Sequence, residues 1–155
     1  MKRSLLLLVL PTFLLLLSSC EKNPEVTPEP TTAETLLGSW QESSSTLTLY
    51  NSNSTKISEE AQPLRSVNFY PNHRFDYRYV NDATLEGMYK LTSDANNEFI
   101  VFTIPEESMT FTIVQLSAKS LTVSCETHNV TYYVDDKPLI AATAIRKMTL
   151  TKCKN

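Results

Sequence analysis

Glycine, histidine and tryptophan are scarce in this sequence. Among 155 residues there are two glycines, two histidines and one tryptophan. Two glycines cannot build a glycine-rich phosphate-binding loop. His73 and His128 stand alone beside expected turns, and neither a His-Glu-x-x-His nor a Cys-x-x-Cys zinc motif occurs. A Gly-x-Ser-x-Gly nucleophile motif is also missing. The sequence therefore predicts no enzyme, no metal site and no cofactor.

Positive charge is also limited. The chain carries 14 Lys and Arg residues against 17 Asp and Glu residues, for a formal net charge of −3. Nucleic-acid binding depends on clustered basic residues, and no basic patch is visible along the chain. These observations predict that nucleic acid is not a partner.

One long apolar run stands at the start of the chain. Lys2 and Arg3 precede "SLLLLVLPTFLLLL", which ends in "LSSC" at Cys20. A membrane-spanning helix needs about 20 apolar residues, whereas a basic start, a shorter apolar run and small residues at its end are typical of a secretory signal. The alternative to a special role for Cys20 is a plain secretory signal whose cysteine joins a disulfide.

The Leu-Ser-Ser-Cys ending resembles the lipobox of bacterial lipoproteins. The resemblance implies a signal peptide at 1–19 and a Cys20 that carries a diacylglycerol thioether and an acylated amine, with palmitate among the fatty acids. Removing the signal peptide deletes two basic residues and no acid, which moves the net charge from −3 to −5. Several acyl chains on one cysteine anchor a protein firmly in a membrane. Glu21 follows the cysteine. Resemblance to the sorting rules of enteric lipoproteins implies the outer membrane of a Gram-negative cell, at its periplasmic face or at the cell surface.

The segment after Cys20 differs in composition from the rest of the chain. "EKNPEVTPEPTTAET" contains three prolines and no aromatic residue, so it cannot bury enough apolar area to order itself. We interpret residues 20–35 as a flexible lipidated tether and residues 36–155 as a single domain, whose length suffices for a hydrophobic core.

An alternation of period two runs through the domain and predicts about nine short antiparallel strands joined by turns. Side chains at even-numbered and odd-numbered positions of a regular strand point to opposite faces of the sheet. Trp40 has even parity whereas Leu47 and Leu49 have odd parity, so a bulge near Ser43–Ser45 must shift the alternation by one residue. The fold class is all-β. A meander hides its edges best as an antiparallel up-and-down barrel of eight to nine strands, and a β-sandwich is the alternative.

Both glycines precede an aromatic residue by two positions, in Gly38-x-Trp40 and in Gly87-x-Tyr89. Gly-x-Trp at the start of the first strand resembles the lipocalin signature, which belongs to the wider group of calycin barrels. The resemblance implies that Trp40 packs across the closed end of the barrel and that an arginine of the last strand, Arg146, stacks on the indole. It also implies that Gly38 and Gly87 allow close approach or bending of the chain. The segments "VNFYPNHRFDY", "LEGMYKL", "FTIVQLSAKSLTVSCE" and "KMTLTK" are similar, in this order, to small lipocalin-like lipoproteins of Gram-negative bacteria.

Two function classes follow. In the first, the barrel binds a small hydrophobic ligand between aromatic walls, or else the same rings fill a solid core. The candidate ligand-binding residues are Tyr77, Tyr79, Tyr89, Phe102 and Phe111. In the second, the domain binds a protein partner or inhibits an enzyme at the cell envelope through the loop Asn51–Pro63 and the turn Asp135–Pro138.

Two cysteines remain in the domain. An oxidising compartment favours a disulfide between Cys125 and Cys153. Cys125 shares parity with inward-facing Leu121 and Val123, whereas Cys153 has the opposite parity, which opposes a bridge unless the strand end twists. The sequence leaves this pairing open.

Overall fold

A computed structural model describes residues 29–81 and 83–154 of the protein. The predicted signal peptide 1–19, Cys20 and the tether up to residue 28 lie outside the described residues. Within them the chain forms one short helix, α1 (Thr32–Leu36), and then nine strands. The strands are β1 (Gly38–Tyr50), β2 (Lys56–Ala61), β3 (Ser66–Phe69), β4 (Arg74–Arg78), β5 (Thr84–Ser93), β6 (Glu98–Ile104), β7 (Glu107–Leu116), β8 (Ser120–Val134) and β9 (Lys137–Lys152).

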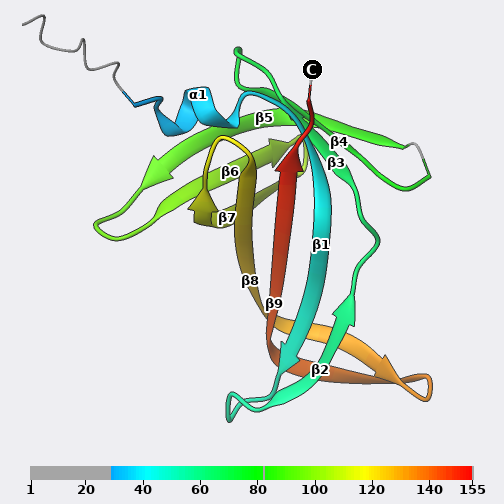
Figure 1. Ribbon diagram of the computed structural model, residues 1–155. Helices are drawn as coiled ribbons and strands as arrows, with labels where there is room; N and C mark the ends of the chain where they lie inside the picture. The colour runs from blue at the N-terminus through cyan, green and yellow to red at the C-terminus, as the bar shows by residue number, and fades with distance from the viewer. Residues whose placement is uncertain (1–28, 82, 155) are drawn as a thin grey trace, which may run out of the picture.

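The strands close into a barrel through the pairing of the first strand with the last. Each strand from β3 to β8 pairs with the next strand along the chain, and Gly38–Gln41 of β1 pair with β3. On its other side β1 pairs with β9 from Trp40 to Tyr50. All of these pairs are antiparallel, so β1 and β3–β9 form a closed up-and-down barrel (Figure 1). The predicted barrel is confirmed, and the β-sandwich alternative is wrong.

Three strands continue beyond the barrel. The outer parts of β1, β8 and β9, together with β2, form a four-stranded sheet in the order β2–β1–β9–β8, which we call the protruding sheet (Figure 1). It has a small core of its own around Leu49, Ala141 and Ala144. The molecule therefore combines a barrel with an open sheet that shares three of its strands.

Two sequence predictions fail in the protruding sheet. Asn51–Pro63 was expected to be a loop, but Lys56–Ala61 is strand β2, which pairs with the outer half of β1. The sequence predicts a turn beside His128, but β8 runs through His128 and Asn129. Asn129 has a φ of 54°, a conformation that asparagine tolerates better than most residues, so the strand bends there without ending.

The predicted bulge in the first strand is confirmed. The register between β1 and β9 shifts between Glu42 and Ser44, and the hydroxyl of Ser43 donates to the carbonyl of Thr149 at 3.1 Å. Trp40 and Glu42 are buried before the shift and Leu49 is buried after it. The bulge thus allows one strand to serve both the barrel core and the core of the protruding sheet.

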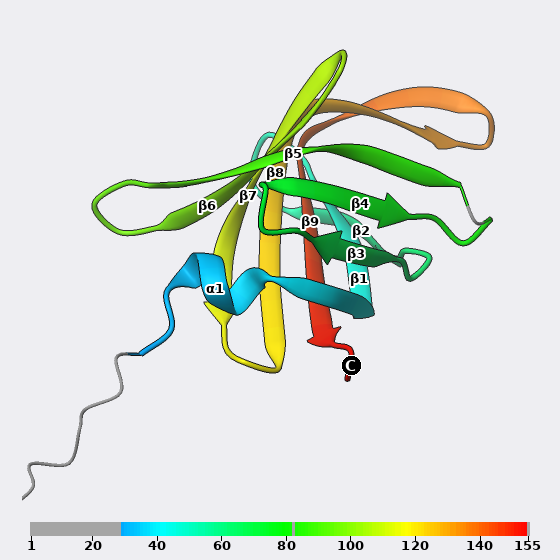
Figure 2. The same ribbon diagram turned by 90° about the horizontal axis from the view of Figure 1, so that it is seen from above.

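Helix α1 occupies the last residues of the expected tether, so the prediction of a flexible segment up to residue 35 is wrong for its end. Thr31 and Glu34 form a capping box that satisfies the backbone at the helix start. The carbonyl of Thr35 accepts from Nζ of Lys152 at 2.8 Å, and the hydroxyl of Thr32 donates to Glu98. Figure 2 shows the helix leading directly into β1. Within residues 29–81 and 83–154, no helix has the length and apolar content to cross a membrane.

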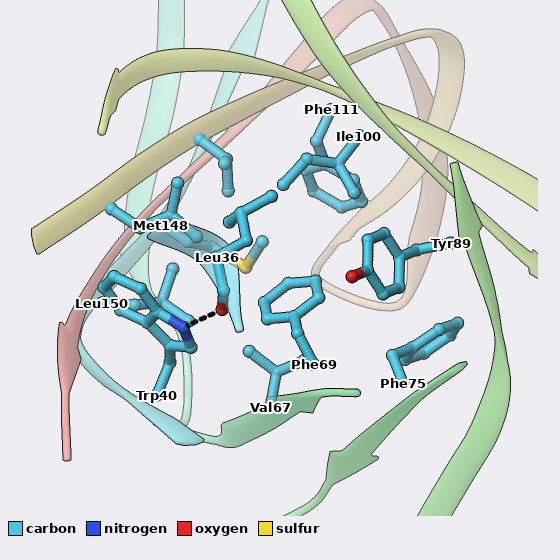
Figure 3. Close-up of a cluster of buried hydrophobic side chains, with 12 residues drawn as sticks. Leu36, Trp40, Val67, Phe69, Phe75, Tyr89, Ile100, Phe111, Met148 and Leu150 are labelled. Atoms are coloured by element: carbon cyan, nitrogen blue, oxygen red, sulfur yellow. Dashed lines mark hydrogen bonds between the residues drawn. The ribbon is translucent and has the colours of Figure 1, made fainter. Parts of the chain in front are cut away.

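A cluster of buried side chains closes the barrel core at the α1 end (Figure 3). Leu36 and Trp40 are both fully buried, and the indole Nε1 donates to the carbonyl of Leu36 at 2.7 Å (Figure 3). Phe69, Phe75 and Leu150 continue this cluster into the barrel (Figure 3). The predicted packing of Trp40 within one end of the barrel is confirmed.

Gly87 lies where β5 changes partners. Thr84–Met88 pair with β4, and Met88–Ser93 pair with β6. A Cβ atom at Gly87 would overlap the carbonyl oxygen of Thr103 and would lie 2.7 Å from Cε1 of Phe75. The glycine is required because both neighbours approach its backbone, as its proposed role in close approach predicts.

We expect Gly87→Ala to lower the free energy of unfolding by about 1–3 kcal/mol, since the new methyl group must displace backbone or a core ring. Urea denaturation followed by circular dichroism measures the change. The control is Met88→Ala at the neighbouring position, where the side chain is 49% exposed. A Gly87→Ala protein as stable as the control would contradict the crowding at this position.

Candidate functional site: the barrel cavity

The barrel encloses a cavity of about 110 Å³. Its body is apolar and is formed by side chains from several strands on all sides of the barrel. These include Val67, Phe75, Ile100, Phe102, Phe111, Leu121, Val123 and Met148. The interior is therefore only partly filled, and the empty part is lined mainly by hydrocarbon.

A cluster of aromatic rings holds one wall of the cavity. The ring centroid of Phe102 lies 4.7 Å from that of Phe75, 5.6 Å from that of Phe111 and 5.9 Å from that of Phe69. The pairs of Phe102 with Phe75 and with Phe111 are edge-to-face, a geometry that stabilises beyond the area that the rings bury. The wall is thus a packed set of rings from four strands.

Four of the predicted ligand-binding rings line the cavity, namely Tyr77, Tyr79, Phe102 and Phe111. Tyr89 does not line it. Its ring is 4% exposed and packs against Phe69 at 5.1 Å, and its hydroxyl donates to the carbonyl of Tyr70 at 3.3 Å. Burial raises the pKa of this phenol. Tyr89 is a core residue, so its prediction as a ligand contact is wrong, whereas ligand binding by the other four stays a prediction.

A group of polar side chains forms one part of the cavity wall. The hydroxyl of Tyr77 donates to Oε1 of Glu42 at 2.8 Å. The same hydroxyl accepts from Nη1 of Arg65 at 3.3 Å and from Nη2 of Arg146 at 3.4 Å. Arg65, Tyr77 and Arg146 all line the cavity. We call Glu42, Arg65, Tyr77 and Arg146 the polar cluster.

Glu42 is the most deeply buried member of the polar cluster, with 1% exposure. Its second oxygen, Oε2, accepts from the backbone N–H of Arg65 at 3.2 Å. Burial raises the pKa of the Tyr77 phenol, while the hydrogen bond from Arg65 lowers it and the charge of Glu42 raises it. Tyr77 is therefore neutral near pH 7, and its hydroxyl can donate a hydrogen bond to the Glu42 side chain.

The polar cluster was not predicted as a site. Glu42 has the parity of Trp40, and Arg146 has the parity of Met148 and Leu150, so an inward direction for both was readable from the sequence. Arg65 lies in the connection between β2 and β3, where no periodic pattern could indicate its direction.

The predicted stacking of Arg146 on the tryptophan is wrong. The register of β9 places Lys152 opposite Trp40 and Arg146 opposite Leu47, in the part of the strand that approaches the protruding sheet. Nζ of Lys152 lies 5.1 Å from the centroid of the indole. A cation from the last strand does cover Trp40, but it is a lysine at the strand end.

The disulfide between Cys125 and Cys153 is not formed, and both cysteines are free. Cys125 pairs with Arg146 in the middle of β8, whereas Cys153 follows the end of β9. Arg146, the partner of Cys125, precedes Cys153 by seven residues, so the two cysteines lie far apart along the β8–β9 ladder. Burial raises the pKa of the Cys125 thiol, and the charge of Arg146 lowers it.

The two segments proposed for protein contacts lie at opposite edges of the protruding sheet, which has β2 at one edge and β8 at the other. The β1–β2 turn and the β8–β9 turn both point away from α1 (Figure 1). Tyr133 is 70% exposed and Ile140 is 69% exposed on the adjoining strands. A protein-binding role for these segments stays a prediction.

Across the described residues, no group of three or more His, Cys, Asp or Glu side chains is placed to hold a metal ion.

Comparison with known proteins finds similarity among solved structures. Neither the protein-family models nor the curated protein sequences contain a match to this chain. Among solved structures, a lipocalin-like protein from Bacteroides uniformis ATCC 8492 aligns with a TM-score of 0.40 and 15% sequence identity, over 77% of this chain and 99% of that protein.

Tyr77→Phe tests the polar cluster. Loss of the hydroxyl leaves the buried carboxylate of Glu42 without one of its donors, which should lower the free energy of unfolding by about 1–3 kcal/mol. The matched control is Tyr79→Phe, since Tyr79 lines the same cavity and keeps its ring contact with Arg65 after the substitution. Thermal denaturation of both variants measures the difference. Equal stabilities would show that the Tyr77 hydroxyl does not support Glu42.

Proposed function

We propose that this protein binds a small hydrophobic ligand inside its barrel and is held at a membrane by a lipid on Cys20. The observation that carries the binding proposal is the apolar cavity of about 110 Å³ within a barrel whose strands are otherwise closely packed. Concave apolar sites with a few polar groups are the usual form of small-molecule sites. The polar cluster supplies such groups.

The size of the cavity limits the ligand. Drug-sized ligands occupy sites of roughly 300–1,000 Å³, whereas an apolar cavity of roughly 150 Å³ accepts benzene. A ligand that fits this barrel without rearrangement therefore has an apolar body of one ring or a short hydrocarbon chain.

An empty apolar cavity also favours binding on energetic grounds. The side chains around it lack dispersion contacts on one side, and a ligand of matching shape restores them. A ligand that binds only the folded state raises its stability by mass action. Binding should therefore be visible both as heat and as a rise in melting temperature.

Val123→Phe tests the binding proposal. Val123 is 3% exposed and lines the cavity, so the larger ring should occupy the ligand's space and weaken binding of octan-1-ol at least tenfold. Isothermal titration calorimetry measures the affinity, and circular dichroism verifies the fold. Val114→Phe makes the same change on β7 at a side chain that is 55% exposed, and it should bind as the unchanged protein does. The proposal fails if octan-1-ol does not bind the unchanged protein, or if Val123→Phe binds it equally well.

The lipid anchor is supported by the Leu-Ser-Ser-Cys motif at Cys20 and by the polar, proline-containing segment that follows it. We expect Cys20→Ser to move the protein from the membrane fraction to the soluble fraction of a Gram-negative host, because serine cannot form the thioether. Fractionation followed by immunoblotting measures this shift. Cys153→Ser, the same substitution at an exposed cysteine of the domain, should leave the protein in the membrane fraction. Retention of Cys20→Ser in the membrane would refute lipidation at this residue.

A further inference from the structure

We propose that the cavity selects ligands with a single negative charge, namely small amphiphiles that end in a carboxylate, and that Arg146 and Arg65 receive this group. The inference rests on the proposed function and adds the chemical class of the ligand. Two observations support it: the charges of the polar cluster and the N–H donor of Arg146 that has no hydrogen-bond partner.

The polar cluster has more positive charge than its own acid balances. Two guanidinium groups, those of Arg65 and Arg146, approach the hydroxyl of Tyr77, while Glu42 is the one carboxylate bonded to that hydroxyl. In the described part of the chain, neither arginine forms an ion pair with an acidic side chain. With Glu42 ionised, these four residues carry one excess positive charge, and both arginines are half-buried among the residues that line the cavity.

Arg146 also has a free donor. Its Nε is buried and has no hydrogen-bond partner within the described residues, and its Nη2 has only the long contact of 3.4 Å with Tyr77. A buried N–H without a partner is unfavourable, so such a group indicates a missing acceptor. Guanidinium groups bind carboxylates through two parallel N–H donors, and Nε can be one of them.

Arg65 stands at the same part of the cavity in an orientation that suits a shared ligand. Its guanidinium lies 4.9 Å from the ring centroid of Tyr79 and 5.6 Å from that of Tyr77. These rings hold the cation in place without neutralising it. A carboxylate beside Arg146 would complete the charge balance, and its hydrocarbon body would lie along Phe102, Phe111 and Leu121, which line the rest of the cavity.

Three probes with the same eight-carbon chain test the proposal, namely octanoate, octan-1-ol and octylammonium. Titration calorimetry with the full-length chain at pH 7 should give at least tenfold tighter binding for octanoate than for octan-1-ol, and no binding for octylammonium. This comparison needs no variant, so a failure of a variant to fold cannot obscure it.

Variants then assign the charge recognition to Arg146. Arg146→Met keeps a long apolar side chain but no charge, so the ratio of its affinities for octanoate and octan-1-ol should fall to about one. Arg78→Met is the matched control on β4, where the arginine is exposed, and it should keep the octanoate preference.

The outcomes separate this inference from the proposed function. Binding of octan-1-ol with an octanoate preference below tenfold, or tightest binding of octylammonium, overturns the inference and leaves a neutral hydrophobic site. An octanoate preference that survives in Arg146→Met also overturns the assignment. Failure of all three probes to bind overturns both the inference and the proposed function.

Discussion

The pairing of β1 with β9 is the interaction on which the rest of the structure depends. It joins Trp40–Tyr50 near the start of the domain to Thr143–Lys152 at its end, so closing it requires almost the whole chain to be ordered. Without this ladder the strands β3–β9 would form an open sheet with two long edges. Both strands contribute to the barrel core and continue into the protruding sheet, and Arg146, Met148 and Leu150 of β9 line the cavity. The bulge at Ser43 places Glu42 inside the barrel immediately before β1 leaves it.

Much of the fold could be predicted from residue parity because each barrel strand has one face in the core. The bulge in β1 followed from the change of parity between Trp40 and Leu47, and the barrel followed from short turns between successive strands. β2 could not be found in this way. Its sequence, Lys56–Ala61, has a single large apolar residue, Ile57, and that side chain is 39% exposed. A strand that adds to the edge of a protruding sheet buries little, so it leaves no alternation in the sequence.

The site was less predictable because it depends on register and on distance across the barrel. Parity indicates that Arg146 faces inward, but only the alignment of β9 with β1 decides that it lies by Leu47 and that Lys152 lies by Trp40. Parity likewise cannot separate Tyr89, which fills the core, from Tyr77, which borders the cavity. An acidic residue two positions after the buried tryptophan was the strongest unused signal, since Glu42 must then be buried with partners of its own.

The start of β1 lies beside the end of β9, because Gly38 begins β1 and Lys152 of β9 pairs with Trp40. A linker from the residues after Lys152 that runs back along α1 to its start would therefore leave the closing ladder intact. New termini could be opened at Asp135-Asp136, the exposed two-residue turn at the tip of the β8–β9 hairpin, where both residues have positive φ. In such a circular permutant β9 would precede β1, and the barrel would close through a local hairpin instead of a contact between the first and last strands.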